Sequence, residues 1–139
     1  MGKVQILAVL TMDGCLSSEL YDKAHQDLCL DRCGLDEIRK KAFYRVTPDY
    51  SISMLHEWRK DCTNIRYLAE ATPDTADYIN GLLRMHAVDE IILYTVPFIS
   101  GSGRHFFKSA LPEQHWTLSS LKSYPNGVCR IIYILDKKA

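Results

Sequence analysis

Hydrophobic residues divide this chain into short apolar runs that are separated by turn-forming residues. The first run, Val4–Met12, has almost no polar positions, which indicates a central strand buried on both faces. Asp13 and Gly14 end this strand as a turn. Apolar residues then recur every four positions, which predicts a helix over Ser17–Cys33 that stops at Gly34. The residues of this stripe are Leu16, Leu20, Ala24 and Leu28.

The segment Leu35–Tyr50 is ambiguous, because it joins a helical pattern to a β pattern. Asp36–Lys41 is typical of a helix, and Phe43–Thr47 is typical of a strand. Pro48 breaks the run. The path of the chain here is therefore left open by the sequence.

The middle of the chain predicts a short helix followed by a strand. The spacing of Ile52, Leu55 and Trp58 favours an amphipathic helix that ends before Asn64. Residues 65–69 then form a short apolar run, which predicts a strand.

A second helix and a buried strand follow. Thr72 as cap, Pro73 at the first helical position and an acid in the first turn predict a helix that runs to about His86. Residues 90–96 are apolar and β-rich, which indicates a strand inside the sheet.

The chain closes with a predicted hairpin, and the order of elements then defines the fold class. Residues 116–124 and 128–135 flank Pro125-Asn126-Gly127, a favourable hairpin turn. The elements run strand, helix, helix, strand, helix, strand and hairpin. This order predicts a single three-layer α/β domain over residues 1–139, with a mostly parallel central sheet and an antiparallel C-terminal hairpin.

Composition excludes several classes of protein. The 139 residues are 47% hydrophobic and 24% charged, and 17 basic residues balance 17 acidic ones. This balance argues against nucleic acid or an anionic membrane as the main partner. The longest apolar run, Ile91–Ile99, is far shorter than the roughly 20 residues of a membrane-spanning helix. Five scattered cysteines are most simply reduced thiols of a cytoplasmic protein.

Three strand ends carry the candidate chemistry: Met12–Gly14, Glu70–Thr72 and Pro97–Arg104. Right-handed crossovers bring such loops to one edge of a parallel sheet, where ligands bind. The amides and guanidinium of Ser100–Arg104 are suited to a phosphate or a ring edge. Glu70 is suited to orient an amino group or relay a proton. An ordinary turn and a helix-flanking acid are the structural alternatives.

Two other polar groups receive no chemical role. His25, Cys29 and Cys33 align on one face of a helix, but the outer two lie about 12 Å apart along its axis. They cannot converge on one ion, so no metal site is predicted. Asp89 and Glu90 precede their strand and so lie at the end opposite the ligand edge, where surface charge is expected.

The loops and their order resemble the dihydrofolate reductase-like superfamily, and most closely the C-terminal reductase domain of bifunctional riboflavin-biosynthesis deaminase/reductases. Residues 10–14, Leu-Thr-Met-Asp-Gly, look like the turn that follows the first strand in that family. Residues 87–107 are similar to its block of valine-aspartate-glutamate, strand, proline, glycine loop and phenylalanine. Residues 116–118 and 124–128 resemble its closing hairpin.

This resemblance implies a reductase that uses NADPH to reduce a pyrimidine or pterin-like heterocycle, such as a ribosylaminouracil. It assigns catalysis to Asp13 and Glu70 and implies a homodimer formed by the terminal strands. It assigns cofactor binding to residues of the three loops. These residues are Thr11, Gly14, Ala71, Thr72, Ser100, Gly101, Ser102, Gly103 and Arg104.

One departure from the family supports a second hypothesis. The family has two glycines after a glutamate where this chain has Glu70-Ala71-Thr72, and those glycines let the cofactor phosphates approach a helix. Its glycine-arginine-threonine segment also has no equivalent between Ser17 and Tyr50. The alternative is a family member that has lost cofactor binding and acts as a binding or assembly module. A third possibility is an unrelated α/β domain, which a first strand at the sheet edge would favour.

Overall fold

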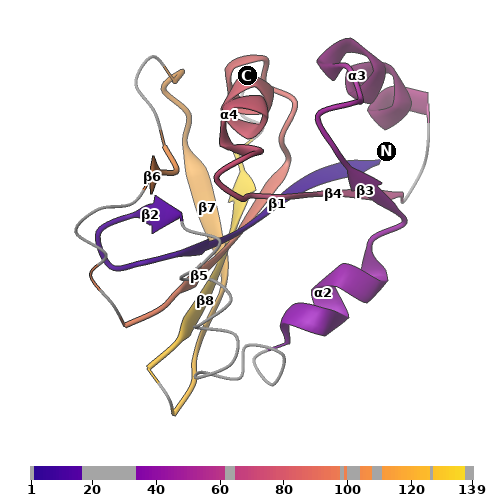
Figure 1. Cartoon of the computed structure of the whole chain (residues 1–139). Coiled ribbons are helices and arrows are strands. Elements are labelled where there is room, and N and C mark those ends of the chain that lie inside the picture. Colours follow the sequence, from indigo (N-terminus) through magenta and orange to yellow (C-terminus); the bar gives the residue numbers. More distant parts are fainter. Residues whose placement is uncertain are drawn as a thin grey trace.

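The computed structural model describes residues 2–16, 34–61, 65–97, 99, 104–107, 111–125 and 127–136. A six-stranded sheet runs through this part of the chain in the order β3-β4-β1-β5-β8-β7 (Figure 1). β3, β4, β1 and β5 are parallel, and β8 and β7 complete the sheet as an antiparallel hairpin. The strands are β1 (Lys3–Leu10), β3 (Tyr44–Val46), β4 (Arg66–Glu70), β5 (Glu90–Thr95), β7 (Trp116–Ser123) and β8 (Cys129–Leu135).

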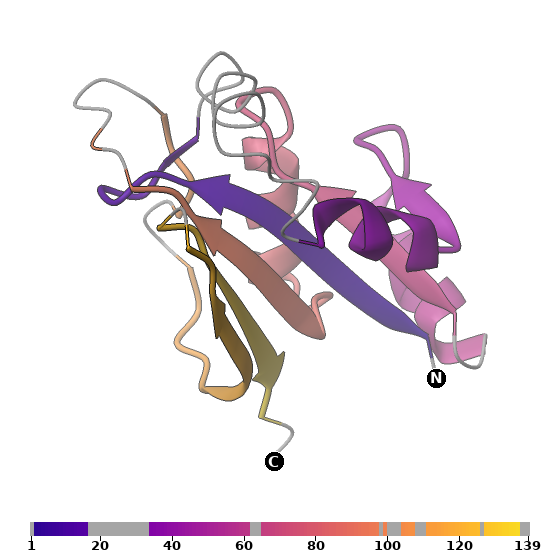
Figure 2. The same ribbon diagram turned by 90° about the horizontal axis from the view of Figure 1, so that it is seen from below.

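Helices cover both faces of this sheet, which confirms the three-layer α/β class. α3 (Ile52–Asp61) and α4 (Ala76–Arg84) lie on one face, and α2 (Leu35–Lys41) lies on the other (Figures 1 and 2). The ambiguous segment therefore resolves into a helix followed by the edge strand β3. The helix predicted over Ser17–Cys33 falls outside the described residues. No helix in the described ranges is long and apolar enough to span a membrane.

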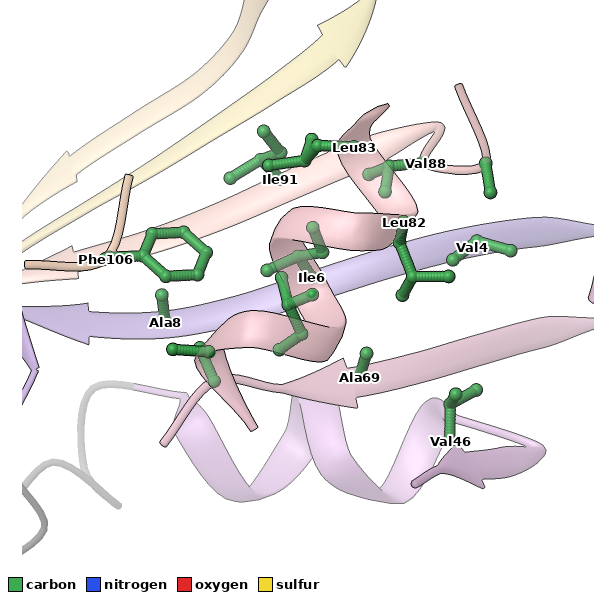
Figure 3. Close-up of a cluster of buried hydrophobic side chains, with 14 of the residues drawn as sticks. Val4, Ile6, Ala8, Val46, Ala69, Leu82, Leu83, Val88, Ile91 and Phe106 are labelled. Atoms are coloured by element: carbon green, nitrogen blue, oxygen red, sulfur yellow. The ribbon is translucent and has the colours of Figure 1, made fainter. Parts of the chain in front are cut away.

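The first strand lies between β4 and β5 and not at the sheet edge. This central position agrees with the resemblance and argues against an unrelated α/β domain. Even-numbered side chains of β1 face α3 and α4, where Val4 and Ile6 are fully buried (Figure 3). Leu7 points to the opposite face and packs with Leu35 of α2. Burial on both faces explains why the run is almost entirely apolar, since each buried aliphatic side chain contributes about 1.5–3 kcal/mol.

The predicted start of α4 is wrong by three residues. Thr72 and Pro73 form a turn, and Thr75 rather than Thr72 is the N-cap residue. The Thr75 hydroxyl accepts a 2.8 Å hydrogen bond from the Thr72 amide and donates a 2.9 Å bond to the Glu70 carbonyl. These bonds hold residues 72–75 as a turn, which delays the helix to Ala76.

Asp89 is not the surface charge that the sequence predicts. Its side chain is only 13% exposed, and its carboxylate accepts a 2.9 Å hydrogen bond from the Val4 amide. The Arg59 guanidinium of α3 lies 3.4 Å from the other oxygen. Asp89 thus ties the start of β1 to the segment before β5. Glu90 is half-buried and accepts a 3.0 Å bond from the Gln5 side chain.

Candidate functional site

The turn after β1 is at the carboxyl edge of the sheet, as predicted. The Gly14 amide donates a 3.0 Å hydrogen bond to the Thr11 carbonyl, and the Thr11 amide donates a 3.2 Å bond to the Cys15 carbonyl. Gly14 has φ +80°, a conformation that favours glycine. A Cβ placed there would meet no atom within 4 Å, so the turn borders open space. A ligand can therefore approach the backbone of this turn.

The Thr11 hydroxyl organises the polar groups of this turn. It donates a hydrogen bond to the Asp13 carboxylate and accepts a 3.0 Å bond from the Cys15 amide. Thr11 itself is buried, whereas Asp13 is half-buried. The second oxygen of Asp13 lies 3.6 Å from the Cys15 thiol, which donates to it. The predicted catalytic acid is thus held in one orientation beside the predicted cofactor-binding residues Thr11 and Gly14.

A second small sheet brings a distant histidine to the same turn. β2 (Cys15–Leu16) pairs with β6 (Arg104–His105), so Cys15 stands opposite His105. The Cys15 sulfur lies 3.9 Å from His105 Nε2, and the imidazole is exposed. Neither residue has a role that was predicted from the sequence. They are separated by 90 positions, and no local pattern marks such a pair.

Burial sets the protonation state of the Cys15 thiol. Desolvation raises the pKa of Cys15 above its ordinary value, and the neighbouring Asp13 charge raises this pKa further. The thiol therefore stays neutral at physiological pH. A neutral, buried thiol is a weak hydrogen-bond donor rather than a nucleophile.

Asn80 of α4 anchors the segment that follows β6. Its side-chain amide is fully buried and donates to the Phe106 carbonyl at 2.7 Å and to the Ala76 carbonyl at 2.8 Å. The Phe106 amide in turn donates a 3.1 Å bond to the Gly14 carbonyl. The loops after β1 and β5 are thereby joined. Only the backbone of Arg104 is described, and the predicted residues Ser100, Gly101, Ser102 and Gly103 fall outside the described ranges.

Glu70, the second predicted catalytic acid, ends β4 and faces α2. Its carboxylate forms an ion pair with the Arg39 guanidinium, which contacts both oxygens. Arg45 of β3 lies 3.7 Å from Oε2. The side chains of Glu70 and Arg39 are 24% and 20% exposed. Glu70 therefore links α2 and β3 to the end of β4. The hydrogen bonds described for Asp13 are instead to Thr11 and Cys15.

The loop after Glu70 uses its backbone amides within the fold. The Ala71 amide donates a 2.7 Å hydrogen bond to the Leu7 carbonyl, and the Thr72 amide donates to Thr75. Pro73 has no amide hydrogen. The Ala71 methyl group packs in the core with Ala76 and so does not block the loop. The difficulty for a cofactor phosphate is the lack of available amides on Ala71 and Thr72, rather than steric obstruction by Ala71.

The described residues contain no group of three or more histidine, cysteine or acidic side chains placed to hold a metal ion. The turn after β1 offers the Asp13 carboxylate, the Thr11 hydroxyl and the His105 imidazole. These groups are suited to bind polar ring edges and to transfer protons.

The central β1, the carboxyl-edge loops and the antiparallel hairpin together define an α/β fold that can be compared with solved structures. The chain matches no protein-family model and no curated protein sequence. Its fold is found in solved structures of riboflavin-biosynthesis and pyrimidine-reductase-like proteins, which confirms the resemblance at the level of the fold.

Three of these structures show the extent of the likeness. A candidate riboflavin biosynthesis protein of Shewanella sp. PV-4 has 11% identity and a TM-score of 0.63, over 97% of this chain and 99% of that one. Acinetobacter baumannii RibD has 12% identity and a TM-score of 0.60, over 99% of this chain but 59% of that one. A pyrimidine reductase-like protein of Corynebacterium diphtheriae has 13% identity and a TM-score of 0.56, over 98% and 92%.

Proposed function

We propose that this protein is an NADPH-dependent reductase of a pyrimidine or pterin-like heterocycle, of the ribosylaminouracil or dihydrofolate reductase type. The observation that carries the proposal is the oriented Asp13 carboxylate beside the open Gly14 turn, at the carboxyl edge of a sheet with this fold. Ligands of open α/β sheets bind at this edge. Likeness to riboflavin-biosynthesis structures supports the choice of a nitrogen heterocycle.

The roles in this proposal follow from the donors and acceptors present. The Asp13 carboxylate accepts hydrogen bonds, so it suits the ring N–H or amino groups of a pyrimidine or pterin. Thr11 positions Asp13, and the exposed His105 imidazole is a candidate proton donor on the facing strand. Glu70 acts in this scheme through Arg39 and Arg45, as a positioning residue.

The Ala71 and Thr72 amides of the β4–α4 loop already have partners, so these two groups do not serve the phosphates of NADPH. This observation favours the second candidate function, a binding or assembly module that keeps the fold without the cofactor. The two candidates differ in a single measurable property, the affinity for NADPH.

The test is a titration of NADPH into the full chain, followed by calorimetry and nicotinamide fluorescence. Saturable binding at micromolar NADPH supports the reductase, and a screen of pyrimidines and pterins then identifies the substrate. Asp13→Asn should lower turnover of that substrate by about 10²-fold or more, while the exposed Asp49→Asn should leave it unchanged. Absence of binding at millimolar NADPH would reject the reductase in favour of the binding module.

The proposal implies two partners, a heterocyclic substrate and a second copy of the chain. The β7–β8 hairpin carries the exposed apolar side chains Leu118 and Leu121 at the sheet edge, which support a homodimer through this surface. Free thiols at Cys15 and Cys129 support a cytoplasmic location.

A further inference from the structure

A groove of about 350 Å³ lies on the α2 face of the sheet, opposite the face that α3 and α4 cover. Ile38 and Lys41 of α2 line one side of the groove, and Ser119 of β7 lines the other. Figure 2 shows α2 over β1 and β4, with the hairpin on the other side of β5. Cavities of this size hold small organic ligands.

Basic side chains outnumber acidic ones in the lining of this groove. Four cations, Lys3, Lys41, Arg66 and Arg130, line it together with a single carboxylate, that of Glu90. The lining thus carries a formal charge of +3, four positive minus one negative, in a chain whose net charge is zero. The potential of such a cleft attracts anions.

Three of the cations gather at one end. Lys3 and Arg66 are register partners on the neighbouring parallel strands β1 and β4, which lie about 4.8 Å apart. The Phe43 amide donates a 2.9 Å hydrogen bond to the Arg66 carbonyl, which brings the end of α2 and its Lys41 to the same strand. All three side chains are exposed. Their mutual repulsion is relieved when an anion binds between them.

The floor of the groove is apolar and extends from this cationic end. Ile92 of β5 and Ile132 of β8 are register partners at its base, and Ile134 continues it. An inorganic anion alone would leave this apolar floor exposed to water. A ligand with both an anionic group and an apolar body uses both parts of the groove.

We propose that this groove binds a small organic phosphate, with the phosphate at Lys3, Lys41 and Arg66 and the organic body on the isoleucine floor. The cationic end is distinct from the carboxyl-edge site. Leu10 lies seven positions after Lys3 on β1, which corresponds to about 23 Å along the strand.

The test uses AMP as the probe, titrated into the full chain by calorimetry. AMP should bind saturably, and both adenosine and inorganic phosphate should bind at least about tenfold more weakly, since each lacks one half of the recognised ligand. The double variant Lys3→Gln/Arg66→Gln should weaken AMP by about tenfold or more. Lys60→Gln, an exposed charge on α3 across the sheet, is the matched control and should change the affinity less than about twofold.

Two further readouts locate the probe and guard against misfolding. Backbone amide shifts in NMR spectra should move at Lys3, Gln5 and Ile132, and not at Thr11–Cys15. If the double variant is unfolded by circular dichroism, the single variant Lys41→Gln on α2 replaces it. The proposal is overturned if AMP fails to bind at millimolar concentration, or if folded groove variants keep full affinity. AMP binding that Asp13→Asn abolishes would assign the probe to the carboxyl edge instead and would equally overturn it.

Discussion

At the scale of single residues, the candidate site depends on groups that the sequence leaves far apart. Asp13 and its turn were predicted from local pattern, because an Asp-Gly pair after an apolar run has a defined geometry. Cys15 and His105 meet through the pairing of β2 with β6, which requires the whole fold. The raised pKa of Cys15 keeps its thiol neutral, so modification of this residue should be slower than that of an exposed cysteine.

Asn80 gives a prediction at this scale. Asn80→Ala removes both hydrogen bonds of the side chain, leaves the Phe106 carbonyl without this donor and opens a small cavity. The free energy of unfolding should fall by about 2–3 kcal/mol, measured by urea denaturation. Gln114→Ala, which removes one solvent-exposed hydrogen bond to His86, is the control and should cost less than about 0.5 kcal/mol. Equal losses in the two variants would contradict the anchoring role.

At the scale of elements, α2 is attached to the sheet by the ion pair between Arg39 and Glu70. A double-mutant cycle with Arg39→Gln and Glu70→Gln should give a coupling energy of about 1 kcal/mol, because the pair is bidentate and partly shielded from solvent. The same cycle for Arg45 and Glu70 is the comparison. Arg45 is 57% exposed and 3.7 Å away, so its coupling should be below about 0.5 kcal/mol. Both coupling energies are measured by urea denaturation. A larger value for Arg39–Glu70 than for Arg45–Glu70 would confirm that Arg39 attaches α2 to the sheet.

Most elements of the described chain could be predicted from sequence, because their apolar periods agree with their final burial. The strands β1, β4 and β5 and the helix α3 have this property. The start of α4 could not be predicted, since Thr72 and Thr75 compete as caps and only the bond from Thr75 to the Glu70 carbonyl decides between them. Asp89 was misjudged for a related reason: its partners Val4 and Arg59 lie far away in the sequence.

At the scale of the whole molecule, a β-bulge shapes the surface proposed for dimerisation. Ser119 has no register partner between Leu118, which pairs with Tyr133, and Ser120, which pairs with Ile132. This extra residue places Leu118 and Leu121 on the same face of β7. The two exposed leucines therefore form a single apolar surface on β7, the last strand of the sheet among the described residues.

The dimer gives a prediction at this scale. Leu118→Lys/Leu121→Lys should shift the protein from dimer to monomer in sedimentation equilibrium, because charges on this face would be buried without partners. Phe43→Lys is the matched control, since Phe43 is 68% exposed next to β3 at the opposite edge of the sheet. It should leave the mass unchanged. A wild-type chain that is monomeric at all concentrations, or a double variant that stays dimeric, would reject this surface.

The central position of β1 has a consequence for synthesis. Val4 is hydrogen-bonded to Asp89, 85 positions later, and both neighbours of β1 are made long after it. A chain emerging from the ribosome therefore carries its most apolar strand without a partner until β4 and then β5 appear. Such non-local pairing slows folding and exposes the nascent strand to aggregation. We expect this protein to need chaperone protection during translation more than a protein whose neighbouring strands follow one another in sequence.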